Sequence, residues 1–389
     1  MKIGIDGRCL EEKNISGVGE YTLELLLHLL EIDKKNRYII FSNSYKQAIG
    51  HIEKLAKFSN VKIERYRWPN KLFNFSLWYF GYPKIDRLIG GVNLFFAPNI
   101  NFLAVSKNCP LILTLHDLSF ERYPEFFSRK TRLWHFFFVN PRKLIRKAEK
   151  IIAVSESTKE DLEKLYGVSS AKISVIRHGV GKSYGVVSRN NPKLLEVQKK
   201  YDLPYKFILY LGNVDPRKNI TSIIRAYDLY REKDSGETKY KLVIAGQMNA
   251  HSYKSVFQAQ KSKYIKDITF IGYVDGDDKP YIYNLSSIFI YPSFFEGFGL
   301  PVLEAMACGK PIICSNSSSF PEVVEKAAIT IDPDRPDEMA EILLSLLKSN
   351  KLQDRLSSAS LNQAKKFSWE KCAQETLDLF QKISSNRLA

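Results

Sequence analysis

The 389-residue sequence has few cysteines, no long apolar run and fewer acidic than basic residues. Its five cysteines form no C-x-x-C pair, so we expect buried thiols in a reducing compartment rather than a disulfide framework or a zinc site. No stretch is long and apolar enough for a membrane-spanning helix. Asp6 and Arg8 interrupt the segment in which a signal peptide would need its apolar centre. We therefore expect a cytoplasmic protein, either soluble or peripheral on the inner face of a membrane.

The acidic deficit gives the chain a net charge of +16, from 58 Lys and Arg against 42 Asp and Glu. The excess is uneven, since residues 51–150 hold 18 basic and 7 acidic side chains. Such a field attracts nucleic acid, anionic lipid or phosphorylated substrates, and charge alone does not choose among them. The length, with 44% hydrophobic and 26% charged residues, is typical of two globular domains.

Short apolar segments alternate with helical stretches in both halves of the chain. Strands are expected at 2–6, 38–41, 61–66, 94–97, 111–115, 151–154 and 173–176, and then at 207–211, 241–245, 268–271, 287–291, 311–314 and 328–331. This alternation predicts an α/β fold with two doubly wound, mostly parallel sheets covered by helices on both faces. The polar segment 181–204 separates the two series, and we interpret it as a linker.

The most informative stretch is 291–309, Y-P-S-F-F-E-G-F-G-L-P-V-L-E-A-M-A-C-G. It predicts a buried strand, a loop containing Gly297 and Gly299, and the start of a helix. The N-terminus of that helix offers N–H groups and the positive end of a dipole to an anion such as phosphate. Glu296 lies at the loop entrance. Glu304 falls about one turn into the helix, where its carboxylate can accept hydrogen bonds from two sugar hydroxyls.

A second loop follows the first predicted strand of the second half, in L-Y-L-G-N-V-D-P-R-K-N. Pro216 stiffens this loop, so that Arg217 and Lys218 can project from it. A guanidinium makes bidentate contacts with phosphate and an ammonium acts as a point charge. The pair is the outline of a diphosphate clamp, although two solvated charges in a turn would be the reading in isolation.

The segment E-G-F-G-L-P-V-L-E-A resembles the two-glutamate signature of glycosyltransferase family 4, whose members are retaining, mannosyltransferase-like group 1 glycosyltransferases. The resemblance implies the GT-B architecture, with two Rossmann-like domains facing each other across a cleft. Residues 1–181 would form the N-terminal, acceptor-side domain and residues 182–371 the domain that binds the nucleotide-sugar donor. A last helix, 372–389, would pack back on the N-terminal domain.

The resemblance also implies roles for the residues of the motif. Glu296 would meet the hydroxyls of the donor sugar, the loop amides would meet the distal phosphate, and Glu304 would hold the nucleotide ribose. The donor-binding positions in this motif are then Gly297, Phe298, Gly299, Leu300 and Glu304. Arg217 and Lys218 would neutralise the departing diphosphate, and Val274 would lie against the nucleobase.

In the first half, His116 follows L-I-L-T-L at a place where the family has a histidine near the donor sugar and phosphate. The resemblance implies that His116 and Glu296 are catalytic; a histidine that only caps a strand is the alternative. Gly17 and Gly19, in S-G-V-G, would belong to a loop at the cleft that shapes the acceptor or donor pocket, unless the turn alone requires them. His178, after another strand, is a weaker candidate.

The implied activity is transfer of mannose or a related hexose from a GDP- or UDP-linked donor to an acceptor hydroxyl, in surface polysaccharide or glycolipid synthesis. In the family, front-face attack assisted by the leaving phosphate needs no protein nucleophile. No carboxylate cluster of the metal-ligand type stands out, so we expect neither a metal nor a cofactor. Arg217, Lys218 and a helix N-terminus would take the place of the cation.

Two segments, 65–82 and 128–147, combine aromatic and basic residues. Helices of this composition can lie in a bilayer interface, so an anionic membrane surface is an expected partner, beside a lipid-linked or saccharide acceptor. The alternative is that the aromatic side chains belong to the core and the charges are solvated. No signature of a nucleic-acid module is present, and no nucleic acid is expected as a partner.

Two other functions stay open at this point. A sugar-nucleotide 2-epimerase shares the two-domain architecture, but it would be expected to carry additional acid–base carboxylates. A nucleic-acid-binding protein would explain the basic charge, but it leaves the loop between Glu296 and Glu304 without a role.

Overall fold

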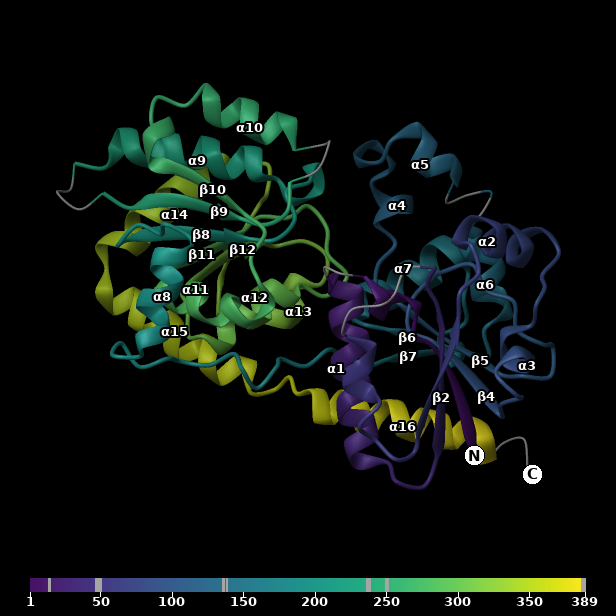
Figure 1. Ribbon diagram of the computed structural model, residues 1–389. Coiled ribbons are helices and arrows are strands. Elements are labelled where there is room, and N and C mark those ends of the chain that lie inside the picture. The colour runs from purple at the N-terminus through teal and green to yellow at the C-terminus, as the bar shows by residue number, and fades with distance from the viewer. Residues whose placement is uncertain are drawn as a thin grey trace. The chain divides into compact units, whose positions relative to one another are not determined.

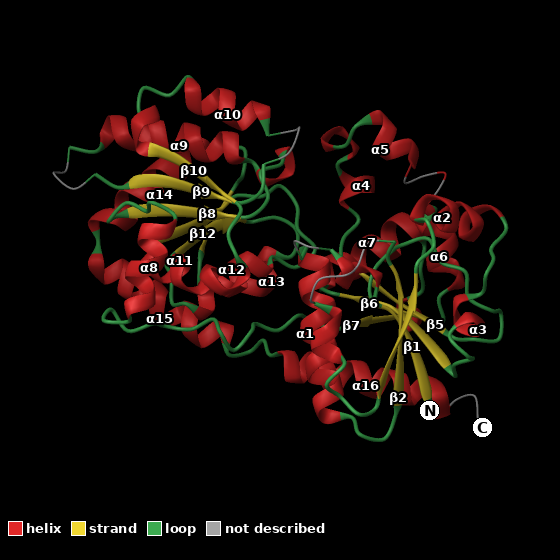
Figure 2. Ribbon diagram, in the orientation of Figure 1, coloured by secondary structure: helices red, strands yellow, loops and turns green. Residues whose placement is uncertain are grey.

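The computed structural model describes residues 1–12, 15–45, 51–134, 137, 139–235, 239–248 and 252–385. The chain forms two compact units (Figure 1). The first comprises Met1–Gly179 and Ser368–Ala389, and the second comprises Val180–Phe367. Each unit has one sheet with helices on both faces (Figure 2).

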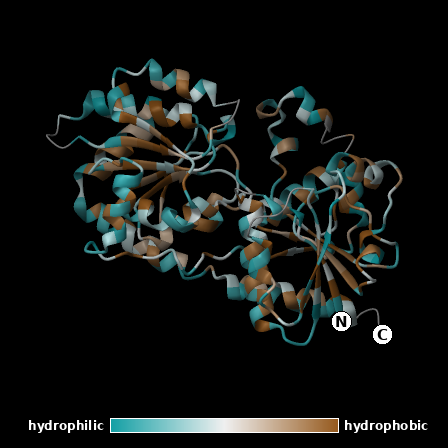
Figure 3. Cartoon of the chain, viewed as in Figure 1, coloured by the Kyte–Doolittle hydropathy of each residue, from teal (hydrophilic) through white to brown (hydrophobic). Residues whose placement is uncertain are grey.

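The first unit contains a seven-stranded parallel sheet in the order β3-β2-β1-β4-β5-β6-β7. Its strands are β1 (Lys2–Asp6), β2 (Arg37–Asn43), β3 (Val61–Tyr66), β4 (Leu94–Ala97), β5 (Leu111–Leu115), β6 (Lys150–Ala153) and β7 (Ile173–Val175). The central strands are almost continuously apolar and buried, as expected of parallel strands covered on both faces (Figure 3). The helices of this unit are α1 (Gly17–Ile32), α2 (Asn70–Tyr79), α3 (Ile85–Leu88), α4 (Ser119–Arg122), α5 (Arg129–Trp134), α6 (Pro141–Lys147), α7 (Glu156–Tyr166) and α16 (Trp369–Ser385).

The second unit contains a six-stranded parallel sheet in the order β10-β9-β8-β11-β12-β13. Its strands are β8 (Phe207–Leu211), β9 (Lys241–Ala245), β10 (Ile268–Gly272), β11 (Ile288–Tyr291), β12 (Ile312–Ser315) and β13 (Ile329–Ile331). Its helices are α8 (Pro192–Lys200), α9 (Ile220–Lys233), α10 (Tyr253–Gln260), α11 (Lys279–Leu285), α12 (Leu300–Ala307), α13 (Phe320–Val324), α14 (Pro336–Lys348) and α15 (Asn350–Ala364). The expectation of two doubly wound parallel sheets is confirmed.

Both sheets reverse their strand order beside their first strand, between β1 and β4 and between β8 and β11. In doubly wound sheets ligands bind outside the carboxyl ends of the strands at such a reversal, because the following loops diverge there and leave a crevice. The fold therefore marks one candidate position in each unit.

The last helix, α16, returns to the first unit and packs on α1. Phe380 of α16 is fully buried, with its ring centroid 5.3 Å from that of Phe96 in β4. The approach at the start of α16 is close, since a Cβ atom on Gly179 would lie 2.0 Å from the backbone nitrogen of Trp369. Residues 386–389 of the expected last helix lie outside the described residues.

Each predicted strand is present, with ends that differ by at most two residues from the expectation. The predicted linker, however, contains α8, which packs on α11 within the second unit. Asn191 caps this helix, Pro192 occupies its first turn, and Val197 is fully buried. The polar and proline residues that suggested a linker are thus helix-start signals.

Among the described residues, no helix is both long enough and apolar enough to cross a membrane.

Candidate functional site

The loops after β8 and β11 meet at the strand-order reversal of the second unit, because these two strands are neighbours in the sheet. The backbone N–H of Phe294 donates to the carbonyl oxygen of Arg217 over 2.9 Å. The hydroxyl oxygen of Ser293 lies 3.2 Å from the same carbonyl oxygen. These contacts bring residues that are 77 and 76 positions apart in the sequence into one cluster.

The cluster is a charge triad formed by Arg217, Lys218 and Glu296. The Lys218 ammonium donates to Oε1 of Glu296 and, over 2.9 Å, to the hydroxyl of Tyr291. Nη1 of Arg217 lies 3.4 Å from Oε2 of Glu296. Ser293 donates to Oε1 of Glu296 over 2.8 Å. The carboxylate is therefore held on both oxygens.

The local sequence explains how Lys218 becomes buried. Pro216–Lys218 forms one turn of 3-10 helix, and the Asp215 side chain caps it by accepting from the backbone N–H of Arg217 over 3.0 Å. Asn219 then adopts a left-handed conformation, with φ +58°, and α9 begins immediately after it. The tight reversal turns the Lys218 side chain into the protein, where it is 8% exposed.

Burial alone would raise the pKa of Glu296, but the charges of Lys218 and Arg217 lower it to about 2. Glu296 is therefore ionised throughout the physiological range. Two cations and one carboxylate leave the triad with a net positive charge in a site that is largely shielded from water. Such a site attracts an anion with oxygens that can accept several hydrogen bonds.

The glycine loop continues from the triad to α12. Gly299 has φ +92° and occupies the cap position of α12, and a Cβ atom there would lie 2.8 Å from Cε1 of Phe320, so glycine is required. Phe298 is buried, and its ring contacts that of Phe367. Leu300 begins the helix, and Pro301 after it has no N–H. The N–H groups of Val302 and Leu303 donate to the carbonyl oxygen of Gly299, so the N–H of Leu300 is the one in this first turn that suits an anion.

Glu304 lies inside α12 and is 4% exposed. Its Oε2 accepts from the hydroxyl of Tyr283 over 2.7 Å, and its Oε1 lies 3.9 Å from Nζ of Lys279. A carboxylate has capacity for further donors beside this one. Sequence reasoning missed Tyr283 and Lys279, although their spacing of four residues places both on one face of α11.

Val274 is buried just after β10, two strand positions from β8 in the sheet. Val274 thus lies apart from the charge triad, and its expected contact with the nucleobase stays a prediction. Gly297 belongs to the same loop as Glu296 and Gly299, and its expected contact with phosphate stays a prediction.

In the first unit, His116 follows β5, and its Nε2 lies 2.9 Å from the carbonyl oxygen of Pro98. Burial lowers the pKa of this histidine, so the neutral ring is favoured. A carbonyl only accepts, which means that Nε2 carries the proton and Nδ1 is the acceptor.

His178, the weaker candidate, lies beside His116 with ring centroids 5.7 Å apart. Its ring also packs between Tyr21 and Trp369, at 4.7 and 5.7 Å. Burial, followed by the proximity of His116, holds the pKa of His178 well below its ordinary value. The two histidines and Tyr21 form an uncharged aromatic cluster, and only the topology reveals it.

Gly17 and Gly19 lie in the first turn of α1 rather than in the preceding loop, because Ser16 caps that helix by accepting from the N–H of Gly19. A Cβ atom on Gly19 would lie 2.7 Å from Cγ1 of Ile15, so packing requires a glycine there. A Cβ atom on Gly17 would meet nothing within 4 Å, and packing does not explain this glycine.

Sequence reasoning also missed an ion pair at the strand-order reversal of the first unit. Asp6 ends β1, and Nη2 of Arg8 lies 2.6 Å from its carboxylate. The same guanidinium donates to the carbonyl oxygen of Phe102 over 2.7 Å. Its Nη1 is buried without a hydrogen-bond partner in the described part of the chain. Arg8 can therefore still donate to a ligand at this position.

No group of three or more His, Cys, Asp or Glu side chains within the described ranges could hold a metal ion. The expectation that the protein needs no metal stays a prediction.

Two family models match the chain. The model described as glycosyl transferases group 1 matches residues 194–363, and the model described as glycosyltransferase family 4 matches residues 15–183.

Relatives with assigned names include two mannosyltransferases of Escherichia coli. O-antigen chain mannosyltransferase B is 31% identical over 274 residues, which are 69% of this chain and 70% of that protein. The serotype-specific mannosyltransferase WbdA is 29% identical over 249 residues, which are 64% of this chain but 30% of WbdA. The chain thus spans under a third of WbdA.

Two solved structures are similar over nearly the whole chain. Sucrose-phosphate synthase from Thermosynechococcus elongatus has a TM-score of 0.76 at 18% identity and covers 99% of both chains. Anabaena HepE in complex with UDP-glucose has a TM-score of 0.74 at 16% identity, covering 98% of this chain and 100% of that one. These similarities show the GT-B fold.

The charge triad predicts the effect of Glu296→Gln on stability. The variant leaves Lys218 buried without its carboxylate, so the free energy of unfolding should fall by about 3–5 kcal/mol in urea denaturation. The folded pKa of about 2 lies below the ordinary value of 4.5, so this contribution is complete above pH 4.5 and is lost as the pH falls toward 2.

Glu341→Gln is the matched control, because its partner Lys233 is exposed and such pairs contribute at most about 1 kcal/mol. Equal effects of the two substitutions at pH 7 would contradict the triad.

Proposed function

Since the chain belongs to the group 1 glycosyltransferases, we propose that this enzyme moves mannose or a related hexose from a nucleotide diphosphate donor to an acceptor hydroxyl, with retention of configuration. The observation that carries the proposal is the charge triad of Arg217, Lys218 and Glu296, bonded to the glycine loop at the carboxyl ends of β8 and β11. Two cations, a fixed carboxylate and the start of α12 thus lie close together in the fold.

The diphosphate of the donor would bind to Arg217, Lys218 and the N–H of Leu300 at the start of α12. Glu296 would accept hydrogen bonds from hydroxyls of the donor sugar, since its orientation is already fixed by Lys218 and Ser293. Glu304 would accept from the ribose hydroxyls, held in place by Tyr283. Val274 would lie against the nucleobase.

In the proposed reaction, the bond between the anomeric carbon and the diphosphate oxygen breaks, and its electron pair passes to that oxygen. The acceptor hydroxyl oxygen forms the new bond on the same face, and its proton passes to the leaving phosphate. Arg217, Lys218 and the N–H of Leu300 stabilise the charge that develops there, without a metal or another cofactor. His116, with Nδ1 as acceptor, would bind a hydroxyl of the sugar.

The mannosyltransferase relatives support mannose as the sugar, and hence a GDP-linked donor. The complex of HepE with UDP-glucose keeps a UDP-linked donor as the alternative. We further propose that the acceptor is a saccharide or a lipid-linked saccharide of a surface polysaccharide or glycolipid, as the O-antigen relative suggests.

Calorimetry with GDP, UDP and their sugar conjugates tests the donor site. One nucleotide should bind, and Glu304→Gln should weaken it at least about tenfold by removing a charged hydrogen-bond acceptor. Glu341→Gln should bind as the wild type does. If folded wild-type protein binds no member of the panel, the proposed function is overturned.

Transfer of the sugar should persist in EDTA, since the proposed site uses no metal. The rate of transfer should fall in Arg217→Ala by about 100-fold or more, because one cation at the leaving group is lost. Lys233→Ala, which removes an exposed cation of the same unit, provides the control. Radiolabelled donor and a saccharide acceptor report the product. Activity that disappears in EDTA and returns with Mg²⁺ would contradict metal independence, and near wild-type turnover in Arg217→Ala would contradict the clamp.

Docking to an anionic membrane is a further part of the proposal, and α2 supports it. Phe73 and Leu77 of this helix belong to the core, so the alternative interpretation of the segment 65–82 holds for them. On the opposite side, Leu72, Phe75 and Tyr79 are 68%, 50% and 66% exposed. Exposed apolar side chains beside basic ones are typical of interfacial helices. Residues 135, 136 and 138 of the second segment lie outside the described residues.

The substitution Phe75→Ala should therefore weaken binding to phosphatidylglycerol vesicles about tenfold in flotation, since it removes exposed apolar area. Phe257→Ala removes a comparably exposed ring from α10 of the second unit and should change little. Absence of vesicle binding by the wild type would dismiss membrane docking while leaving the transfer activity untouched.

A further inference from the structure

A pocket of about 1010 Å³ opens in the first unit among α4, α5 and α6. It is at the upper end of the volumes of small-molecule sites. Its lining includes neither the histidine pair nor the ion pair after β1. The pocket is therefore separate from the candidate positions described above.

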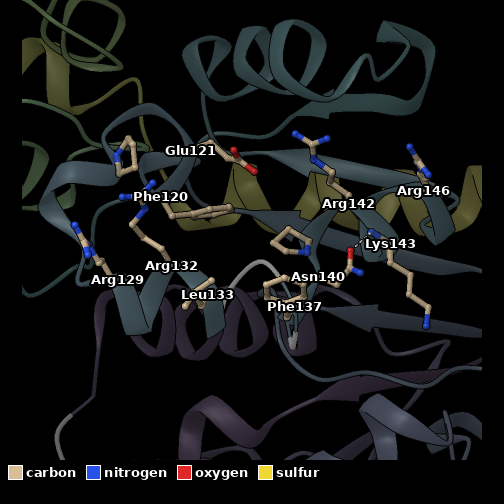
Figure 4. Close-up of a pocket in the computed structure, with 12 residues that line it drawn as sticks. Phe120, Glu121, Arg129, Arg132, Leu133, Phe137, Asn140, Arg142, Lys143 and Arg146 are labelled. Carbon is tan, nitrogen blue, oxygen red and sulfur yellow. Dashed lines mark hydrogen bonds between the residues drawn. The ribbon is translucent and has the colours of Figure 1, made fainter.

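Five cations line the pocket, and helix spacing gathers them into two groups. Arg129 and Arg132 are three residues apart on α5, and Arg142 and Arg146 are four residues apart on α6, so each pair shares a helical face. Lys143 is the fifth. In Figure 4 the α5 pair lies on one side of the pocket and the three α6 cations on the other. Within the described ranges, none of the five forms an ion pair with a carboxylate.

One carboxylate, Glu121, also lines the pocket. Its Oε1 accepts from the hydroxyl of Tyr166 in α7 over 2.8 Å. The guanidinium carbon of Arg142 lies 5.3 Å from the centroid of the same tyrosine ring. Glu121 is thus engaged by the pocket wall, and the lining keeps a net charge of +4. A site of this kind selects a ligand with at least two negative charges.

The rest of the lining is apolar. Phe120 lies between the two groups of cations in Figure 4, and Leu133 is 57% exposed at the rim. Pro124 and Pro141 add rigid apolar surface. An inorganic anion would leave these side chains in water, whereas an anion that carries a hydrocarbon chain would cover them.

We propose that this pocket binds the phosphate or diphosphate group of a lipid-linked acceptor, with the apolar lining receiving the first part of its hydrocarbon chain. The role as acceptor site rests on the proposed glycosyl transfer. The binding of the lipid phosphate itself does not. The arginines of α5 and α6 grip the phosphate oxygens from opposite sides, and Phe120 and Leu133 contact the chain.

Farnesyl diphosphate, a soluble short-chain probe, tests the proposal by calorimetry with the full chain. It should bind to the wild type, and Arg132→Gln and Arg146→Gln should each weaken it roughly tenfold, as expected for loss of a hydrogen bond to a charged group. Lys130→Gln is the matched control, because this lysine is exposed on α5 but does not line the pocket. It should leave the affinity unchanged.

Two further probes separate the parts of the ligand. Pyrophosphate, which lacks the chain, and farnesol, which lacks the anion, should each bind at least about tenfold more weakly than farnesyl diphosphate. Pyrophosphate binding as tightly as farnesyl diphosphate would overturn the apolar part of the proposal. An equal loss of affinity for farnesyl diphosphate in Lys130→Gln would show that the total charge matters rather than the pocket residues, and it would overturn the proposed site.

Nucleotide binding by the same samples distinguishes this proposal from the proposed function. If the protein binds GDP or UDP but not farnesyl diphosphate, the proposed lipid-phosphate site is overturned and the proposed donor site is retained. If the protein binds farnesyl diphosphate but no nucleotide, the proposed lipid-phosphate site is retained and the proposed donor site is overturned. Far-UV circular dichroism of each variant verifies that it is folded.

Discussion

The buried pair of Lys218 and Glu296 is the interaction on which the candidate site of the second unit depends. Removing two charges from water is expensive, and well-packed apolar side chains of the same volume would often be as stable or more so. The cost is offset here by the additional bonds from Ser293 and Tyr291 and by the nearby guanidinium of Arg217. The pair fixes the location of both charged groups, because it joins the loops after β8 and β11 at the strand-order reversal.

The same constraint explains why the glycine loop has the shape it has. Glu296 is held by the triad and α12 is held by its packing on α15 and α13, so the few residues between them must turn sharply. Gly299 makes that turn with a positive φ angle and without a side chain that would collide with Phe320. A phosphate and a sugar attached to it could then be held by one rigid loop.

The sequence was sufficient for the strands, because buried parallel strands are short apolar runs bounded by turn residues. It was also sufficient for the family, since the segment from Glu296 to Glu304 is specific. It was not sufficient for contacts that depend on strand order. Lys218 and Glu296 are adjacent only because β8 and β11 are neighbours. His116 and His178 meet because β5 and β7 lie on either side of β6. The five cations of the basic pocket all lie in the segment 128–147, which the sequence marked as basic and aromatic, but the sequence did not predict that two helices bring them to one pocket.

The composition of the charge triad favours a particular kind of ligand under the proposed function. A bare nucleotide diphosphate would be attracted by Arg217 and Lys218 but repelled by the neighbouring carboxylate of Glu296. A nucleotide sugar reduces that conflict, because its hydroxyls can donate to Glu296 while its phosphates accept from the two cations. During such a transfer the diphosphate would gain negative charge, so the cations and the N–H of Leu300 would interact more strongly with the transition state than with the bound donor. That difference, rather than tight binding of the donor, would accelerate the proposed reaction.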